Sequence, residues 1–212
     1  MAKVSAIRAG KKGRKRVSLF LDGRFSLSLE AEVVVRENLR IGQELSAEQI
    51  AVLSRADRCR RCLDAAANYL SYRPHSEAEL RQRLVKRGFE DSSVEAALRL
   101  LEERGLVDDI GFARFWRDSR QSLKPCSRWL TRLELRKKGV AEDIIDQVVD
   151  TVDDDDSAYR AAMAKLRSLP QTDYQGFRRR LGEYLKRRGF SYGVINQTVR
   201  RIWQEQGEPG QI

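Results

Sequence analysis

The residue types best suited to chemistry in this chain are a cysteine pair and a run of aspartates. Cys59 and Cys62 are separated by two residues, and Cys126 with His75 would complete the four ligands of a zinc site. The pair lies in a helical pattern without a neighbouring strand, and no second closely spaced ligand pair exists, so idle or buried thiols are favoured over a metal site. Three cysteines, an odd number, also argue against a disulfide framework and favour a reducing cytoplasm.

The aspartate run at residues 153–156 could suggest a metal-dependent nuclease. Such an enzyme needs carboxylates that converge from separate elements, whereas consecutive side chains point in different directions. The run is better explained as a cap for a helix beginning near Ser157, and Asp108-Asp109 similarly precedes the helix around Phe112. The sequence contains no Gly-rich phosphate loop, nucleophile elbow or HExxH motif, and its single histidine cannot form a triad. We therefore expect no catalysis, no metal and no cofactor.

Positive charge is the remaining chemical feature, with a formal net charge of +10. Residues 1–57 carry 11 Lys and Arg against 7 Asp and Glu, residues 58–157 carry 19 against 20, and residues 158–212 carry 11 against 4. An excess of cations favours an anionic partner such as nucleic acid or an acidic protein surface. The balanced middle could face protein while a basic end contacts phosphate. No secretory signal and no apolar run of about 20 residues is visible, so we expect no membrane partner.

The elements that position these cations come from a repeat of about fifty residues. Three similar segments each end in two cations, a glycine and an apolar residue, which indicates tandem supersecondary units. Ser76 and Ser127 stand as helix caps twelve residues before the first two glycines, whereas the third segment has Phe177 in that place, so its start should differ. Glycine suits the left-handed position that ends a helix. The three glycines are Gly88, Gly139 and Gly189.

Each glycine-marked helix is followed by another helix whose apolar residues recur at helical spacing. Helices this short bury little by themselves, so the units should pack on their neighbours in an elongated, curved array. The apolar triplets are Val94, Leu98 and Leu101, then Ile145, Val149 and Val152, then Ile195, Val199 and Ile202.

The N-terminal part has a different pattern. Alternation over 17–21 and 24–29 on either side of Asp22-Gly23 predicts a β-hairpin, and residues 3–8 could add a third strand. A short helix over 30–38, a second helix capped by Ser46 and a third over 58–72 should follow. The fold class is therefore mainly α, with three three-helix repeats preceded by a small β-rich module. The expected divisions are residues 1–57 for the module, 58–107, 108–156 and 157–205 for the repeats, and 206–212 for a polar tail.

Over residues 58–205 the chain resembles the RecX family of bacterial recombination regulators. The third repeat is the weakest match, and the N-terminal β module lies outside the core family pattern. The segments that carry the resemblance are Tyr69–Leu84, Gly88-Phe89, Gly105–Asp109 with Phe112–Arg114, and Leu133–Gly139.

The resemblance implies a non-enzymatic protein that binds the filament of the recombinase RecA on DNA along its groove. Members of the family block strand exchange and lower ATP hydrolysis and co-protease activity; some limit filament extension or promote disassembly, and some bind DNA. We expect a cytoplasmic monomer that acts in DNA repair, recombination and the SOS response and contacts RecA together with single-stranded and also double-stranded DNA. The alternative is a stand-alone DNA-binding protein built from helix-turn-helix-like repeats.

The cations of the repeats are the candidates for contact with recombinase or DNA. Cations in the last turn also stabilise the helix dipole, and this explanation stays open. The basic loop Lys11–Arg16 is a further cationic patch or a solvated turn, while Trp116, Trp129, Tyr184 and Trp203 are expected in cores. The candidates are Arg81, Arg83, Lys86, Arg87, Arg114, Arg117, Arg132, Arg136, Lys137, Lys138, Arg178, Arg179, Arg180, Lys186, Arg187 and Arg188.

Overall fold

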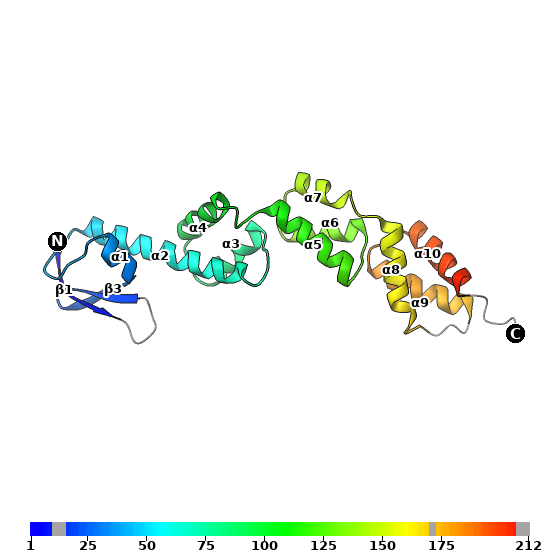
Figure 1. Cartoon of the computed structure of the whole chain (residues 1–212), viewed down its shortest axis with the longest axis horizontal. Coiled ribbons are helices and arrows are strands. Elements are labelled where there is room, and N and C mark those ends of the chain that lie inside the picture. Colours follow the sequence, from blue (N-terminus) through cyan, green and yellow to red (C-terminus); the bar gives the residue numbers. More distant parts are fainter. Residues whose placement is uncertain (10–15, 170–172, 207–212) are drawn as a thin grey trace. The chain divides into compact units, whose positions relative to one another are not determined.

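The computed structural model describes residues 1–9, 16–169 and 173–206, which form four strands and ten helices (Figure 1). The chain divides into two compact units. The first comprises Met1–Arg73 with Leu80–Leu106, and the second comprises Pro74–Glu79 with Val107–Ile212. No helix of the described residues is long and apolar enough to cross a bilayer. The basic loop over 11–15 and the tail from residue 207 lie outside the described residues.

The N-terminal module is an antiparallel sheet of order β3-β2-β1-β4. Asp22 and Gly23 have φ values of 48° and 78°, as a two-residue hairpin turn requires, so the predicted hairpin is confirmed. One face of the sheet buries Val4 and Leu19 against Leu53 of the following helix. The strands are β1 (Ala2–Ala9), β2 (Arg16–Leu21), β3 (Arg24–Glu30) and the unpredicted β4 (Glu44–Leu45), with helix α1 (Ala31–Arg36) after β3.

Helix α2 (Ala47–Leu70) joins the sheet to the first three-helix domain, because it contacts both β3 and α4. Two separate helices were expected here, and that expectation was wrong. No glycine or proline interrupts the chain between Ser46 and Pro74, so nothing in this stretch ends the helix. The capping box of Ser46 with Gln49 is confirmed in both directions.

Three three-helix domains follow, as predicted. The glycines after α3, α6 and α9 all have φ between 75° and 91°, so their left-handed conformation is confirmed. All nine residues of the apolar triplets are buried. The helices are α3 (Glu77–Lys86) and α4 (Asp91–Glu103) with α2; α5 (Asp109–Leu123), α6 (Arg128–Lys137) and α7 (Glu142–Val149); and α8 (Asp154–Leu166), α9 (Tyr174–Arg187) and α10 (Tyr192–Glu205).

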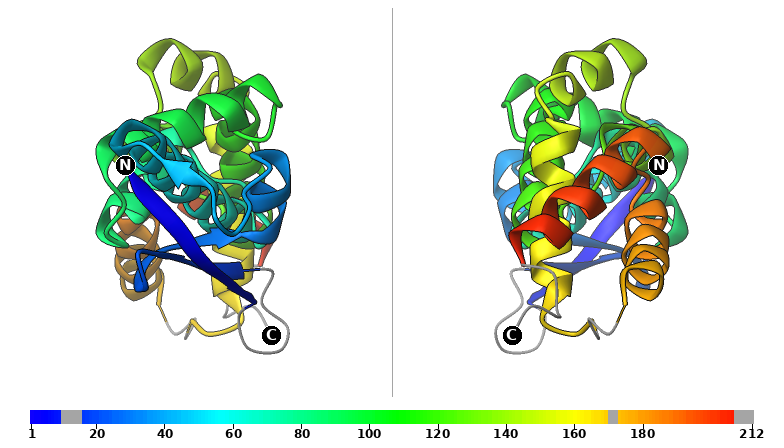
Figure 2. Two further views of the ribbon diagram at one scale, coloured as in Figure 1. Left: turned by 90° about the vertical axis from the view of Figure 1, so that its left-hand side faces the viewer. Right: turned by 90° about the vertical axis from the view of Figure 1, so that its right-hand side faces the viewer.

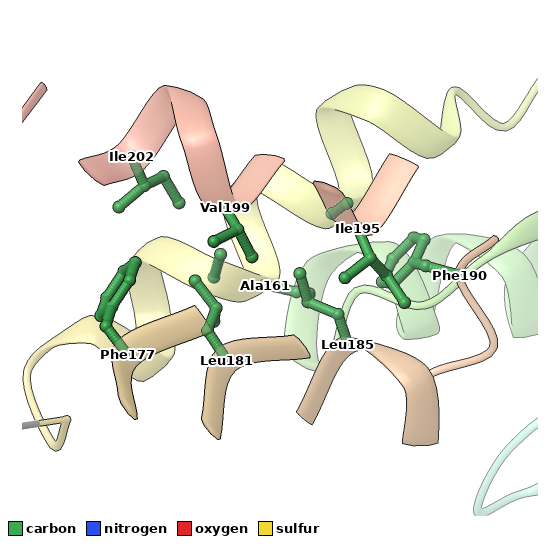
Figure 3. Close-up of a cluster of buried hydrophobic side chains, with 10 residues drawn as sticks. Ala161, Phe177, Leu181, Leu185, Phe190, Ile195, Val199 and Ile202 are labelled. Atoms are coloured by element: carbon green, nitrogen blue, oxygen red, sulfur yellow. The ribbon is translucent and has the colours of Figure 1, made fainter. Parts of the chain in front are cut away.

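The third domain has its own core between α8, α9 and α10. Leu181, Leu185 and Val199 are buried there, and Figure 3 shows them facing one another from α9 and α10. The right-hand view of Figure 2 shows α10 crossing α8, and the two helices are in contact. The predicted difference at the start of its middle helix is confirmed: α9 begins at Tyr174, where the Asp173 carboxylate accepts a hydrogen bond from the Gly176 amide.

Candidate nucleic-acid and protein interface

The aspartate run has the structural role predicted for it. Asp153 is the N-cap of α8, and its carboxylate accepts hydrogen bonds from the amides of Asp155 and Asp156. The helix therefore begins at Asp154, a little before the predicted start. Asp108 caps α5 in the same way through the Ile110 amide.

Burial raises the pKa of all three cysteine thiols. Cys62 is fully buried, and this burial is the main cause that raises the pKa of its thiol to about 11. The neighbouring Cys59 raises the pKa further in the same direction. Burial also raises the pKa of Cys126, whose sulfur lies 3.5 Å from the Thr131 hydroxyl. A thiol with a pKa this high is a poor nucleophile at neutral pH.

The glycine-marked ends of α6 and α9 contact residues 76–78 and 127–130, respectively, and all of these residues belong to the second unit. We call these two contacts the glycine joints. At the first joint, the Ser76 hydroxyl donates a hydrogen bond to the Lys138 carbonyl at 2.6 Å, and a Cβ on Gly139 would overlap the Cβ of Ala78. The negative end of the α6 dipole thus meets the positive start of α3. Glycine at position 139 is required by this close approach as well as by its φ of 75°.

The second joint repeats the arrangement at α9. The Ser127 amide donates to the Arg188 carbonyl at 3.0 Å, and a Cβ on Gly189 would lie 2.6 Å from the Ser127 hydroxyl. Trp129 borders this glycine but is 61% exposed, so its expected place in a core was wrong. The indole lies at a joint between helices, which apolar periodicity within one helix does not reveal.

The second cation before each joint glycine stabilises the joint. The Lys138 ammonium lies 2.6 Å from the Glu79 carboxylate and 3.9 Å from the centre of the Trp116 ring. Arg188 donates to the Pro125 carbonyl at 2.9 Å and covers the Tyr184 ring. These two candidates therefore have a clear structural role.

Several other candidate arginines are paired within their own domains. Arg132 lies 2.6 Å from the Asp146 carboxylate, and Arg136 donates to both carboxylate oxygens of Glu142, which lowers the pKa of that carboxyl. Arg117 donates to Asp118 at 2.8 Å and to Thr151 at 2.9 Å. Arg83 lies over the ring of Tyr69, and Arg81 is half-buried.

The remaining cations are the ones whose charge is available to a partner. Their side chains are exposed and make no hydrogen bond or ion pair within the described residues. They are Lys86, Arg87, Arg114, Lys137, Arg179, Arg180, Lys186 and Arg187.

Two of these cations meet Arg178 in a groove between α9 and α10, which we call the basic groove. It has a volume of about 810 Å³, and Arg178, Arg179 and Lys186 line it. Phe190 and Ile195 supply its apolar part, and Figure 3 shows them at the same end of the domain core. The other lining residues are Tyr174, Gln175, Gly182, Glu183, Tyr192 and Asn196.

Tyr192 is a residue of this groove that the sequence interpretation missed. It is 71% exposed and begins α10 directly after the cap Ser191. Arg178 donates to its phenol oxygen at 3.2 Å. The hydrogen bond with Asn196, and then the Arg178 charge, lower the pKa of Tyr192. An aromatic residue at the first position of a helix, outside the apolar stripe, is the sequence signal that could have found it.

The fold and the surface define a protein of three-helix domains with an N-terminal sheet, whose exposed cations suit an anionic or acidic partner. Family models match it in order: the regulatory protein RecX N-terminal domain over residues 2–46, and the first, second and third RecX three-helix domains over 62–102, 108–149 and 153–199. The chain belongs to the RecX family.

Individual relatives agree with this assignment. The regulatory protein RecX of Chlorobaculum tepidum is 38% identical over 144 residues, 68% of this chain and 89% of the relative. That of Clostridium botulinum is 28% identical over 206 residues, 94% and 96% of the two chains. The crystal structure of a regulatory protein RecX matches 93% of this chain and 98% of its own, with a TM-score of 0.67 and 25% identity. RecX from Lactobacillus salivarius shares the fold, with a TM-score of 0.59 and 20% identity.

The comparisons correct one expectation from the sequence. The β module was expected to lie outside the core family pattern, but a family model for the RecX N-terminal domain covers residues 2–46. In a strand, successive side chains point to opposite faces, and this short alternation is a weaker sequence signal than the glycine-marked helices. The module therefore carried few recognisable motifs.

Proposed function

We propose that this protein is a non-enzymatic regulator of homologous recombination and DNA repair, which binds the RecA filament on DNA and inhibits strand exchange, ATP hydrolysis and co-protease activity. The ordered match of all four RecX domains is the observation that supports this most strongly. A regulator of this kind would work in the cytoplasm, where the recombinase and the chromosome meet.

The distribution of available cations supports a filament as the partner. Exposed cations lie on all three domains, with Arg87 on the first, Lys137 on the second and Arg179 on the third. A filament repeats the same surface many times, so weak contacts from similar domains can add up through effective concentration. We propose that the domains contact recombinase subunits and that the basic groove holds the DNA or its vicinity.

The test is a titration of recombinase ATPase and strand exchange with this protein and with a variant in which Arg178, Arg179 and Arg180 are all changed to alanine. The triple variant should inhibit more weakly, and the difference should shrink as salt rises, because exposed charges are screened. Equal inhibition by variant and wild type at every salt concentration would exclude these arginines as contacts.

A matched control removes three exposed cations elsewhere. Arg55, Arg99 and Arg104 are exposed residues of the first unit, and their side chains make no ion pair within the described residues. The alanine variant of these three loses the same net charge but leaves the basic groove intact. Its inhibition should match that of the wild type, which separates a local contact from a loss of overall charge.

The basic groove also favours a second candidate function, a stand-alone DNA-binding protein. Cations beside an exposed aromatic ring are typical of surfaces that bind nucleic acid directly. Fluorescence anisotropy with bare single- and double-stranded DNA, with and without recombinase, separates the two. Tight binding that is independent of recombinase, together with unchanged ATPase, would favour the second function.

A further inference from the structure

From the basic groove we infer that the third domain binds single-stranded nucleic acid through its bases, with Tyr192 as the stacking residue and the rim cations holding the flanking phosphates. This inference rests on the proposed function, because it names the form of nucleic acid that the DNA-contacting part of the regulator takes.

The lining of the groove is mixed in the way that a nucleotide requires. Its volume of about 810 Å³ is in the range of about 300–1,000 Å³ that small-ligand sites occupy. Phe190 and Ile195 give it an apolar wall, and Gly182 contributes no side chain that would fill it. A purely phosphate-binding surface would not need the apolar wall.

Tyr192 presents an aromatic face that the fold itself does not use. Its side chain is 71% exposed, whereas Tyr174, on the same groove, packs edge-on against Trp203 with ring centres 5.3 Å apart. Arg178 donates a hydrogen bond to the phenol oxygen of Tyr192 at 3.2 Å, which orients the ring at the rim. A base can therefore stack on a ring that is already oriented, with little loss of side-chain entropy.

The charges around the ring suit phosphates on either side of a stacked base. Arg178, Arg179 and Lys186 come from α9, and α10 begins at Tyr192, so the positive end of its dipole lies at the groove. Glu183 is the one carboxylate among the lining residues. Its carboxylate can accept a hydrogen bond from an exocyclic amine of a base.

Single strands are favoured over duplexes because the faces of paired bases are covered by their neighbours in the stack. A duplex could reach only the rim cations. The inference therefore predicts that removing the bases, while keeping every phosphate, weakens binding.

The experiment compares a fluorescein-labelled oligothymidylate of 20 residues with an abasic oligonucleotide of equal length. The wild-type protein should bind the oligothymidylate about tenfold more tightly than the abasic strand, which corresponds to about 1.4 kcal/mol. Tyr192→Ala should lower the affinity for the oligothymidylate to that for the abasic strand. The affinity for the abasic strand should stay unchanged. Tyr192→Phe should retain most of the difference.

Two controls distinguish stacking from charge. Tyr72→Ala removes a tyrosine that is 81% exposed on the first unit, and it should change neither affinity. Arg179→Ala should weaken binding to both strands and reduce the slope of log affinity against log salt by about 0.7, the value for one phosphate of a single strand.

Equal affinity of the wild type for the two strands, or equal losses on both in Tyr192→Ala, would overturn the inference. Recombinase ATPase, measured on the same samples, distinguishes failure of the base-stacking inference from failure of the proposed function. Inhibition of the ATPase without a difference between the strands refutes base stacking alone, whereas an unaffected ATPase refutes the proposed function.

Discussion

The first glycine joint predicts that Gly139→Ala destabilises the protein about twice as much as the same change at Gly88. An alanine in the left-handed region costs about 1–2 kcal/mol at either position, since φ is 75° at Gly139 and 91° at Gly88. At Gly88 a Cβ would meet nothing within 4 Å, whereas at Gly139 it would overlap the Cβ of Ala78. Overpacking of this kind adds about 1–3 kcal/mol. We therefore expect a loss of about 3 kcal/mol for Gly139→Ala and about half of that for Gly88→Ala.

The assay is urea unfolding followed by circular dichroism at 222 nm for both variants. Ala78→Gly removes the methyl group against which the new side chain would press, so the double variant with Gly139→Ala should recover the overpacking part of the loss. Equal losses at the two glycines, or no recovery in the double variant, would show that the ends of α6 and α3 do not meet in solution.

Three further predictions concern single side chains. Lys138→Met removes the ammonium group from the Glu79 carboxylate and should lower the free energy of unfolding by about 2 kcal/mol in urea titrations; a loss as small as that of an exposed lysine would contradict the joint. Cys62 in the folded protein at pH 8 should react with iodoacetamide about 100-fold more slowly than in the unfolded chain, since its pKa is about 11 instead of 9.0; peptide mass spectrometry would reveal equal rates if this is wrong. Burial raises the pKa of Asp109 although the Glu77 amide donates to it, so the folded state holds this proton more tightly and stability should fall as pH rises above the ordinary value of 3.8. Asp109→Asn should remove that fall, and parallel pH profiles of variant and wild type would refute it.

Local signals in the sequence predicted the helices and their ends. A glycine after two cations, a serine cap twelve residues earlier and an apolar triplet are requirements of one three-helix domain, and each acts over a few residues. The hairpin at Asp22-Gly23 was predictable for the same reason. The missed continuity of α2 was an error of interpretation, because the absence of any breaker after Ser46 was visible in the sequence.

The glycine joints were not predictable, because they join residues far apart in the chain. Nothing near Gly139 indicates that Ala78 approaches it. The same limit applies to the candidate cations: Lys137 and Lys138 are adjacent and alike in sequence, yet one is exposed and the other is paired with Glu79 across a joint. Only the structure separates the cations that take part in the glycine joints from those that remain available to a partner.

The most direct test of the proposed function is the DNA-dependent ATPase of the RecA recombinase, titrated with this protein on single-stranded DNA. A regulator that binds the filament should lower ATP hydrolysis with increasing dose and slow strand exchange over the same concentrations. An unchanged ATPase at concentrations that saturate bare DNA would contradict the account and leave direct DNA binding as the function of the basic groove.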